Sequence, residues 1–119
     1  MGTADIELDT LLRTLSLDVS FANLLAPTTA AHIHCCTPPT GNALVATQVP
    51  SFIGFPLGVT SGTYSQVFDM MLASFYNPSF ITAHGGTVDS AFDFLVAGML
   101  TGQSYLNILN RFSLRQHEY

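Results

Sequence analysis

The sequence predicts a mainly β protein, an antiparallel, Greek-key-like β-sandwich with a short two-helix insertion before the last strands. Apolar and polar residues alternate at strand period early in the chain, most clearly over residues 14–25, so that successive side chains point to opposite faces. Short segments of this kind are separated by turns rich in Pro and Gly, which favours a sandwich or an open barrel. The 119 residues fit one domain spanning residues 1–119.

The strands are expected in a simple order along the chain. The short connection TLLRT (10–14) between the first two predicts a hairpin. Pro27, and later Pro38, Pro39 and Gly41, interrupt the chain where strands must end. Six strands and a further one at the end are therefore expected, at residues 5–9, 14–25, 29–36, 43–49, 59–70, 103–109 and 110–119.

Two helices are expected between the fifth and sixth strands. Asn77 followed by Pro78 is a helix start, because Asn accepts from unpaired amides and Pro suits the first turn. This short helix should end at Gly85-Gly86. Thr87 caps a second helix, which Gly102 ends. Its apolar positions recur at helical spacing and predict an amphipathic stripe: Val88, Phe92, Leu95, Val96 and Met99.

The composition excludes several classes of function. Charged residues make up 9% of the chain, there is no lysine, and the net charge is −5. Such a chain has no basic patch for phosphates or anionic lipid, which argues against a nucleic-acid partner. The longest apolar run, residues 94–100, is far shorter than the ~20 residues of a membrane helix. Low charge also means weak repulsion between copies, which favours an extracellular or assembled protein.

His32 and His34 are the most specific chemical feature. Residues i and i+2 of a strand point to the same face, so both imidazoles project side by side, as a chelating metal site requires. Cys36 joins them if the strand continues, which makes an H-x-H-x-C set suited to copper or zinc. The alternative is a pair of hydrogen-bonded histidines near a sheet end. We expect His84 to lie at a helix C-terminus and His117 at the surface.

Cys35 and Cys36 are adjacent and are the only cysteines. They form two thiols, a redox-sensitive ring, or part of a metal site, and two thiols are the default expectation. We find no nucleophile motif, phosphate loop or dinucleotide fingerprint in the sequence, so no catalytic and no cofactor-binding residue is assigned. Most of the aromatic residues in loops should fill the ends of the sandwich: Phe52, Phe55, Phe75, Tyr76 and Phe80.

Residues 15–108 resemble the CHRD domain, the module first named for chordin and also found in bacterial secreted proteins. The pieces that carry the resemblance are AAHIH, PLGVTSGTY, YNPSF, GGT and GQSYLNI, in this order and spacing. The resemblance implies a secreted or cell-surface β-sandwich, distantly similar to the copper/zinc superoxide dismutase fold, whose copper site also uses an H-x-H pair on a strand.

The C-terminal residues depart from the family pattern. Members typically read N-I-H and then F-P-G-G-E-I-R-G, which closes the sandwich. Here Asn107-Ile108 is followed by Leu109, so the histidine that would join His32 and His34 is missing, and residues 109–119 form a divergent tail. His117 replaces it only if the tail folds back. A weak closing strand also leaves an unpaired edge, which recruits another chain.

Two functions follow as expectations. The first is a secreted or cell-surface, non-catalytic structural or binding module that pairs through edge strands into a homo-oligomer, filament or surface layer. Other extracellular proteins or cell-surface components are further partners. The second is a copper- or zinc-binding protein with His32, His34 and Cys36 as ligands and redox activity. The N-terminus is not an intact signal peptide, so either a leader has been removed or the chain is cytosolic.

Overall fold

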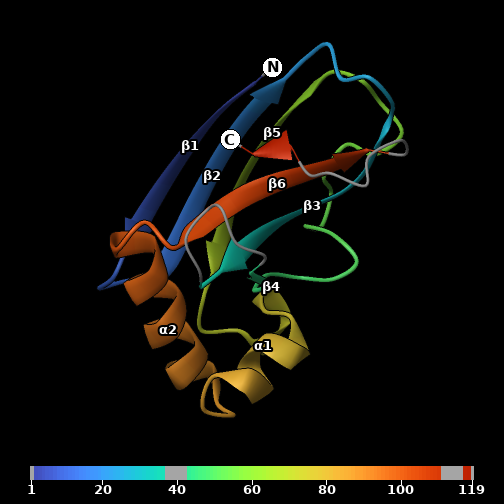
Figure 1. The fold of residues 1–119 in the computed structure, drawn as a ribbon. Helices are drawn as coiled ribbons and strands as arrows, with labels where there is room; N and C mark the ends of the chain where they lie inside the picture. Colours follow the sequence, from blue (N-terminus) through green and yellow to red (C-terminus); the bar gives the residue numbers. More distant parts are fainter. Residues whose placement is uncertain (1, 37–42, 111–116, 119) are drawn as a thin grey trace.

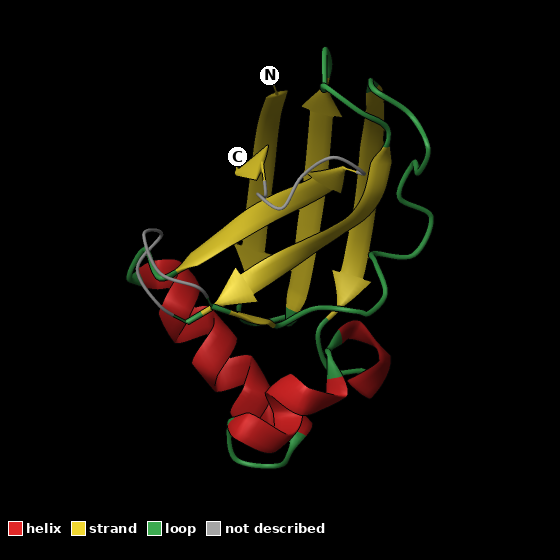
Figure 2. Ribbon diagram, turned by 45° about the vertical axis from the view of Figure 1, so that its right-hand side comes forward, coloured by secondary structure: helices red, strands yellow, loops and turns green. Residues whose placement is uncertain are grey.

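The computed structural model describes residues 2–36, 43–110 and 117–118. Two antiparallel sheets lie face to face, with their strands crossing obliquely, and two helices sit together at one end (Figures 1 and 2). After the first hairpin, the chain passes back and forth between the two sheets. The mainly β sandwich with a late two-helix insertion that the sequence predicts is confirmed.

The three-stranded sheet has the order β1-β2-β5. The strands are β1 (Gly2–Asp9), β2 (Thr14–Phe21) and β5 (Gly62–Asp69). The central strand alternates strictly, and its inner side chains Leu15, Leu17, Val19 and Phe21 are buried. β1 and β2 form the expected hairpin, in which the Asp9 carboxylate accepts from the amides of Leu11 and Leu12 at 2.9 Å.

The four-stranded sheet has the order β4-β3-β6-β7. Its strands are β4 (Leu44–Val45), β3 (Thr28–Cys35), β6 (Ser104–Asn110) and β7 (His117–Glu118). Every residue of β3 except Thr29 is buried, because both of its faces are covered. This strand is therefore the buried centre of the molecule.

Several strand boundaries differ from the expected ones, and the first strand begins at Gly2 and the fifth at Gly62. The second strand ends at Phe21 because Asn23 has φ +60°, a left-handed conformation that breaks a ladder and that Asn tolerates. The fourth strand is only two residues long. The chain after it bonds to β3 singly, as when Ala46 N–H donates to the Ile33 carbonyl. Of the last strand, the structure shows β7, and residues 111–116 lie outside the described part.

The helical insertion follows β5 through a short 3-10 turn, η1 (Ala73–Phe75). Helix α1 (Pro78–Ala83) begins after Asn77, whose side chain accepts from the Ser79 amide. Helix α2 (Val88–Leu100) begins with a capping box between Thr87 and Ser90. Both helix starts are as predicted, and no described helix has the length and apolar character needed to cross a membrane.

The five loop aromatics, which the sequence placed at the ends of the sandwich, belong to the hydrophobic core. All five are buried, and together with Tyr64 and Phe68 of β5 they form a chain of ring contacts with centroid separations of 4.9–6.5 Å. Arg13 anchors α2 to the β1–β2 turn. Its guanidinium lies 2.9 Å from Asp89 and 4.8 Å from the centroid of the Phe92 ring.

Candidate functional site

Strand β3 holds the histidine pair on the face that points away from the core between the sheets. Ile33 and Cys35 point inward, whereas His32 and His34 alternate with them on the other face. The two imidazole centroids are 6.0 Å apart, and the rings meet edge to face. The prediction that the two rings lie side by side is confirmed.

Both rings are almost fully buried, at 6% and 5% exposure, and each bonds to a backbone carbonyl. His32 Nε2 lies 2.6 Å from the Pro50 oxygen, and His34 Nδ1 lies 2.9 Å from the Ala43 oxygen. The His34 ring also stacks on Tyr105 at 5.2 Å. Burial lowers the pKa of His32 below its ordinary value of 6.5. The Pro50 carbonyl opposes this shift in pKa, and the neighbouring His34 adds to it.

These two bonds decide which nitrogen of each ring carries its proton. A carbonyl only accepts, so the nitrogen facing it must be the N–H donor in a neutral ring. The other nitrogens, His32 Nδ1 and His34 Nε2, therefore present lone pairs. Both are buried and have no hydrogen-bond partner among the described residues. A carbonyl that fixes the tautomer while the opposite nitrogen stays open is the arrangement found behind metal-binding histidines.

Asn107 is a member of this buried polar group that the sequence reasoning did not single out. It is the register partner of His32 on β6 and is completely buried. Neither atom of its side-chain amide has a hydrogen-bond partner in the part of the chain that the structure describes. The signal was available in principle, because pairing the segments AAHIH and YLNIL antiparallel places an amide opposite a histidine.

Of the remaining histidines, His84 packs elsewhere, and His117 lies on β7, where it is the register partner of Ile108, so the end of the chain folds back onto β6. His84 is the C-cap of α1, as expected, and its ring packs between Phe80 and Phe94 at 4.5 Å from each. His117 is in β7, and its side chain lies outside the described residues. Within residues 2–36 and 43–110, no three His, Cys, Asp or Glu side chains gather closely enough to hold a metal ion.

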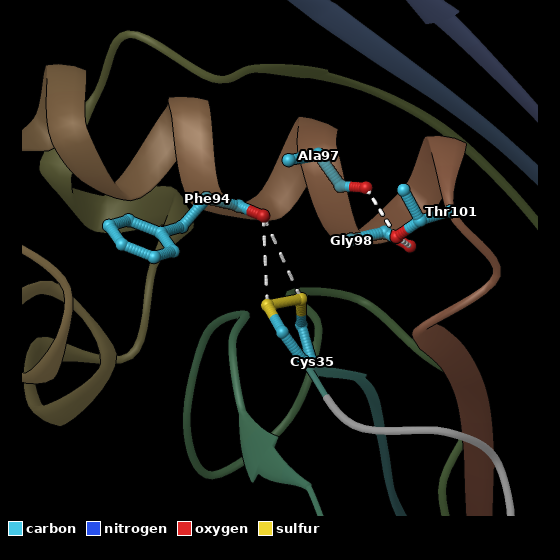
Figure 3. Close-up of a disulfide and its surroundings, with 6 residues drawn as sticks. Cys35, Phe94, Ala97, Gly98 and Thr101 are labelled. Carbon is cyan, nitrogen blue, oxygen red and sulfur yellow. Dashed lines mark hydrogen bonds between the residues drawn. A yellow bond between two sulfur atoms is a disulfide. The ribbon is translucent and has the colours of Figure 1, made fainter.

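Cys35 and Cys36 are joined by a disulfide, which corrects the expectation of two thiols (Figure 3). Their sulfurs lie against helix α2, 3.9 and 3.6 Å from the carbonyl oxygen of Phe94. Metal ligation requires a thiolate, so the proposed role of Cys36 as a ligand applies only to the reduced protein.

Gly98 gives the disulfide its space. A Cβ built on this buried glycine would overlap the Cys35 sulfur and would lie 3.1 Å from the Cys36 sulfur. Glycine inside a helix costs about 0.5–1 kcal/mol relative to alanine, so the close approach of the sulfurs gives this position a reason to be glycine. The sequence showed only a Gly that interrupts an apolar run, and the contact depends on the tertiary structure.

Of the comparisons with known proteins, the comparison with protein families finds a match. The family model described as CHRD domain matches residues 1–111. The match confirms the resemblance and extends it at both ends, so that it includes all of β1 and β6. No curated protein and no solved structure matches the chain.

Proposed function

The chain belongs to the CHRD domain family, and from this premise we propose that it is a non-catalytic extracellular module that associates with copies of itself through the edges of its three-stranded sheet. A small β module of this family fits binding rather than catalysis. Other extracellular proteins or cell-surface components are the alternative partners of the same edges.

The observation that carries the proposal is that both edge strands of the three-stranded sheet, β1 and β5, have an unpaired outer edge. β1 and β5 are eight residues long, and both pair with β2. Along their outer edges they make no backbone hydrogen bond to another strand of the described chain. Neither strand contains lysine, proline or a register shift, which are among the devices that protect an edge, although β1 carries three acids. Long open edges of this kind pair with further strands.

Strand direction and charge favour pairing of β5 with β1 of the next copy. Both strands run antiparallel to β2, so they run parallel to each other, and a copy shifted sideways presents its β1 to β5. Pairing of β1 with itself would align the acids Asp5, Glu7 and Asp9 on one face, which is unfavourable. The same face of β5 has one acid, Asp69. Head-to-tail pairing does not close on itself, so it gives filaments.

Two features support an extracellular location. CHRD domains occur in extracellular proteins. The Cys35–Cys36 bond also fits an oxidising compartment, because disulfides rarely persist in the cytosol.

The test is the size of the assembly as a function of concentration. We expect light scattering after gel filtration to show species that grow as concentration rises, and electron microscopy to show linear particles. Val67 is 63% exposed on the outer face of β5, so Val67→Glu adds a charge facing the acids of β1 and should block growth. Leu25→Glu, at an exposed loop residue with 84% exposure, is the matched control and should assemble normally. Monomers alone at every concentration would overturn the proposal.

The two open nitrogens of the histidine pair favour a second candidate function, binding of copper or zinc. His32 Nδ1 and His34 Nε2 would be the ligands, and Asn107 would supply an amide oxygen from the neighbouring strand. The Cys36 sulfur lies against α2 and does not gather with the two rings, so Cys36 would join them only as a thiolate that has moved away from the helix. Bound copper would supply redox chemistry. The chain itself fixes the tautomers through the carbonyls of Pro50 and Ala43.

Metal analysis after loading tests this second candidate. We expect one copper or zinc ion per chain after dialysis, and loss of the ion in both His32→Ala and His34→Ala. His84→Ala is the control, because that ring packs between two phenylalanines away from the pair. Absence of bound metal in the folded wild-type protein would remove the candidate and leave the module proposal untouched.

A further inference from the structure

We propose that the Cys35–Cys36 disulfide is a site of reversible thiol–disulfide exchange, at which a dithiol reductant loosens helix α2 from the four-stranded sheet. The disulfide lies between the end of β3 and the middle of α2 (Figure 3). The inference concerns the helical end of the molecule and does not depend on the edges or on the histidine pair.

The position of the bond in the sequence argues against an ordinary stabilising role. A disulfide stabilises a fold chiefly by closing a loop of the unfolded chain, and the effect grows with the number of residues in the loop. Here the bonded residues are adjacent, so the bond encloses no loop and joins no two separate elements. With only two cysteines in the chain, no other disulfide can form within it. The bond therefore affects mainly the packing of the residues that contact its two sulfurs.

Those residues lie on one surface of α2. Both sulfurs face the Phe94 carbonyl at 3.9 and 3.6 Å, and Gly98, one helical turn later, lies so close that a Cβ there would overlap the Cys35 sulfur. The same helix is held elsewhere by the buried side chains of Phe92 and Leu95 and by the Arg13–Asp89 ion pair. A change at the sulfurs therefore acts on the docking of the C-terminal half of α2.

Reduction changes both the volume and the hydrogen bonding at this contact. Two unbonded sulfurs must separate to van der Waals distance, and the space toward Gly98 is already filled. Each new thiol is also a weak S–H donor facing the Phe94 carbonyl, which favours contact with α2, so the loosening comes from the larger volume of the separated sulfurs. We infer that α2 moves away from the end of β3 to accommodate the two thiols.

The exchange is balanced with a dithiol as co-reactant. A thiolate of the reductant attacks Cys36 Sγ, because Cys36 is half-buried while Cys35 is completely buried. The Cys35–Cys36 bond breaks, and Cys35 leaves as a thiolate that takes a proton. The second thiolate of the reductant then displaces Cys36 from the mixed disulfide. Overall, two electrons and two protons pass to the protein, and the reductant becomes a disulfide.

Hydrogen exchange of the full chain with and without dithiothreitol tests the proposal. Alkylation with iodoacetamide after unfolding first counts the thiols, with none expected in the oxidised protein and two after reduction under native conditions. We expect the amides of α2 to exchange about tenfold faster or more in the reduced protein, whereas those of β2 stay unchanged. Reoxidation should restore slow exchange.

Two variants distinguish the effect of the disulfide's contact with α2 from any other effect of dithiothreitol on hydrogen exchange. Cys36→Ala cannot form the bond, so its exchange should not respond to dithiothreitol. Gly98→Ala places a methyl group against the Cys35 sulfur and should speed exchange of α2 in the oxidised protein. Unchanged exchange of α2 in wild-type protein with two alkylatable cysteines would overturn the proposal. So would a disulfide that resists dithiothreitol until the protein unfolds, or native oxidised protein with two free thiols. These wild-type measurements decide the matter even if a variant does not fold.

Discussion

The outer faces of the two sheets contrast sharply. On the three-stranded sheet, the outward residues of β1, β2 and β5 are mostly acids, serines and threonines in contact with solvent, such as Asp5, Asp18 and Ser65. On the four-stranded sheet, the outward residues His32, His34 and Asn107 are as buried as the core. Polar residues alternate with apolar ones in both sheets. The contrast shows that the alternation of side chains along a strand predicts on which face each one lies, but not whether that face is exposed to solvent.

The largest effect should come from the inner face of the exposed sheet. Leu17 is completely buried, so Leu17→Ala should lower the free energy of unfolding by about 2–5 kcal/mol. Its neighbour Asp18 is exposed, lies opposite Asp5 and accepts from Ser65 Oγ at 2.5 Å. Asp18→Ala should change stability by only about 0.5 kcal/mol or less. Urea unfolding followed by circular dichroism measures both, and similar losses would contradict the assignment of faces.

On the buried outer face of the four-stranded sheet, removal of a polar group should raise the free energy of unfolding rather than lower it. The Asn107 amide has no partner among the described residues and is completely buried. Replacement by an apolar residue of similar size, Asn107→Leu, should raise the free energy of unfolding of the metal-free protein by about 1–3 kcal/mol. The same variant should weaken copper or zinc binding if the pair holds metal. A destabilised variant in urea unfolding would show that the amide has a partner.

A smaller loss is expected where the three-stranded sheet meets α2. Arg13→Ala removes an ion pair with Asp89, which is largely exposed, and the contact of the guanidinium with the Phe92 ring. Together these should be worth about 0.5–1 kcal/mol at low salt. Arg13→Lys keeps the charge but not the planar group, so it should recover only part of the loss. Thermal unfolding at two salt concentrations separates the two contributions.

The mildest effect is a dependence of stability on pH. The native pKa of His32 is lowered, so below its ordinary value of 6.5 the unfolded chain binds a proton that the native state does not. Stability contributed by the neutral ring is present above pH 6.5 and is lost as pH falls toward the lowered native value. Urea unfolding in the presence of a chelator should show this decline. His32→Gln should flatten it, whereas equal slopes in both proteins would contradict burial of a neutral ring.

Much of the fold could be predicted from short-range patterns. Alternation located β1, β2, β5 and β6, and the Asn77 and Thr87 caps located both helix starts, because these signals depend on a few neighbouring residues. The segment after residue 43 was harder. It contacts β3 through single bonds, such as that of Ile33 N–H to Thr47 Oγ1, and forms only two residues of strand. Such bonds depend on a partner distant in sequence and leave no local period.

The candidate site was predicted in part. The i, i+2 spacing placed His32 and His34 on one face, but the carbonyls that set their tautomers come from Ala43 and Pro50. Asn107 reaches the pair only through the pairing of β3 with β6. The ligand role of Cys36 stays a prediction for the reduced chain.

By itself, the amino-acid sequence determined the fold class, the faces of the strands, the helix caps and the scarcity of basic residues, because each depends on local geometry or simple composition. Only the tertiary structure decided which polar face is buried and which edges stay open. It also decided that a glycine in α2 makes room for two sulfurs at the end of β3. These features depend on residues distant in sequence that meet in space, and no short-range pattern encodes such meetings.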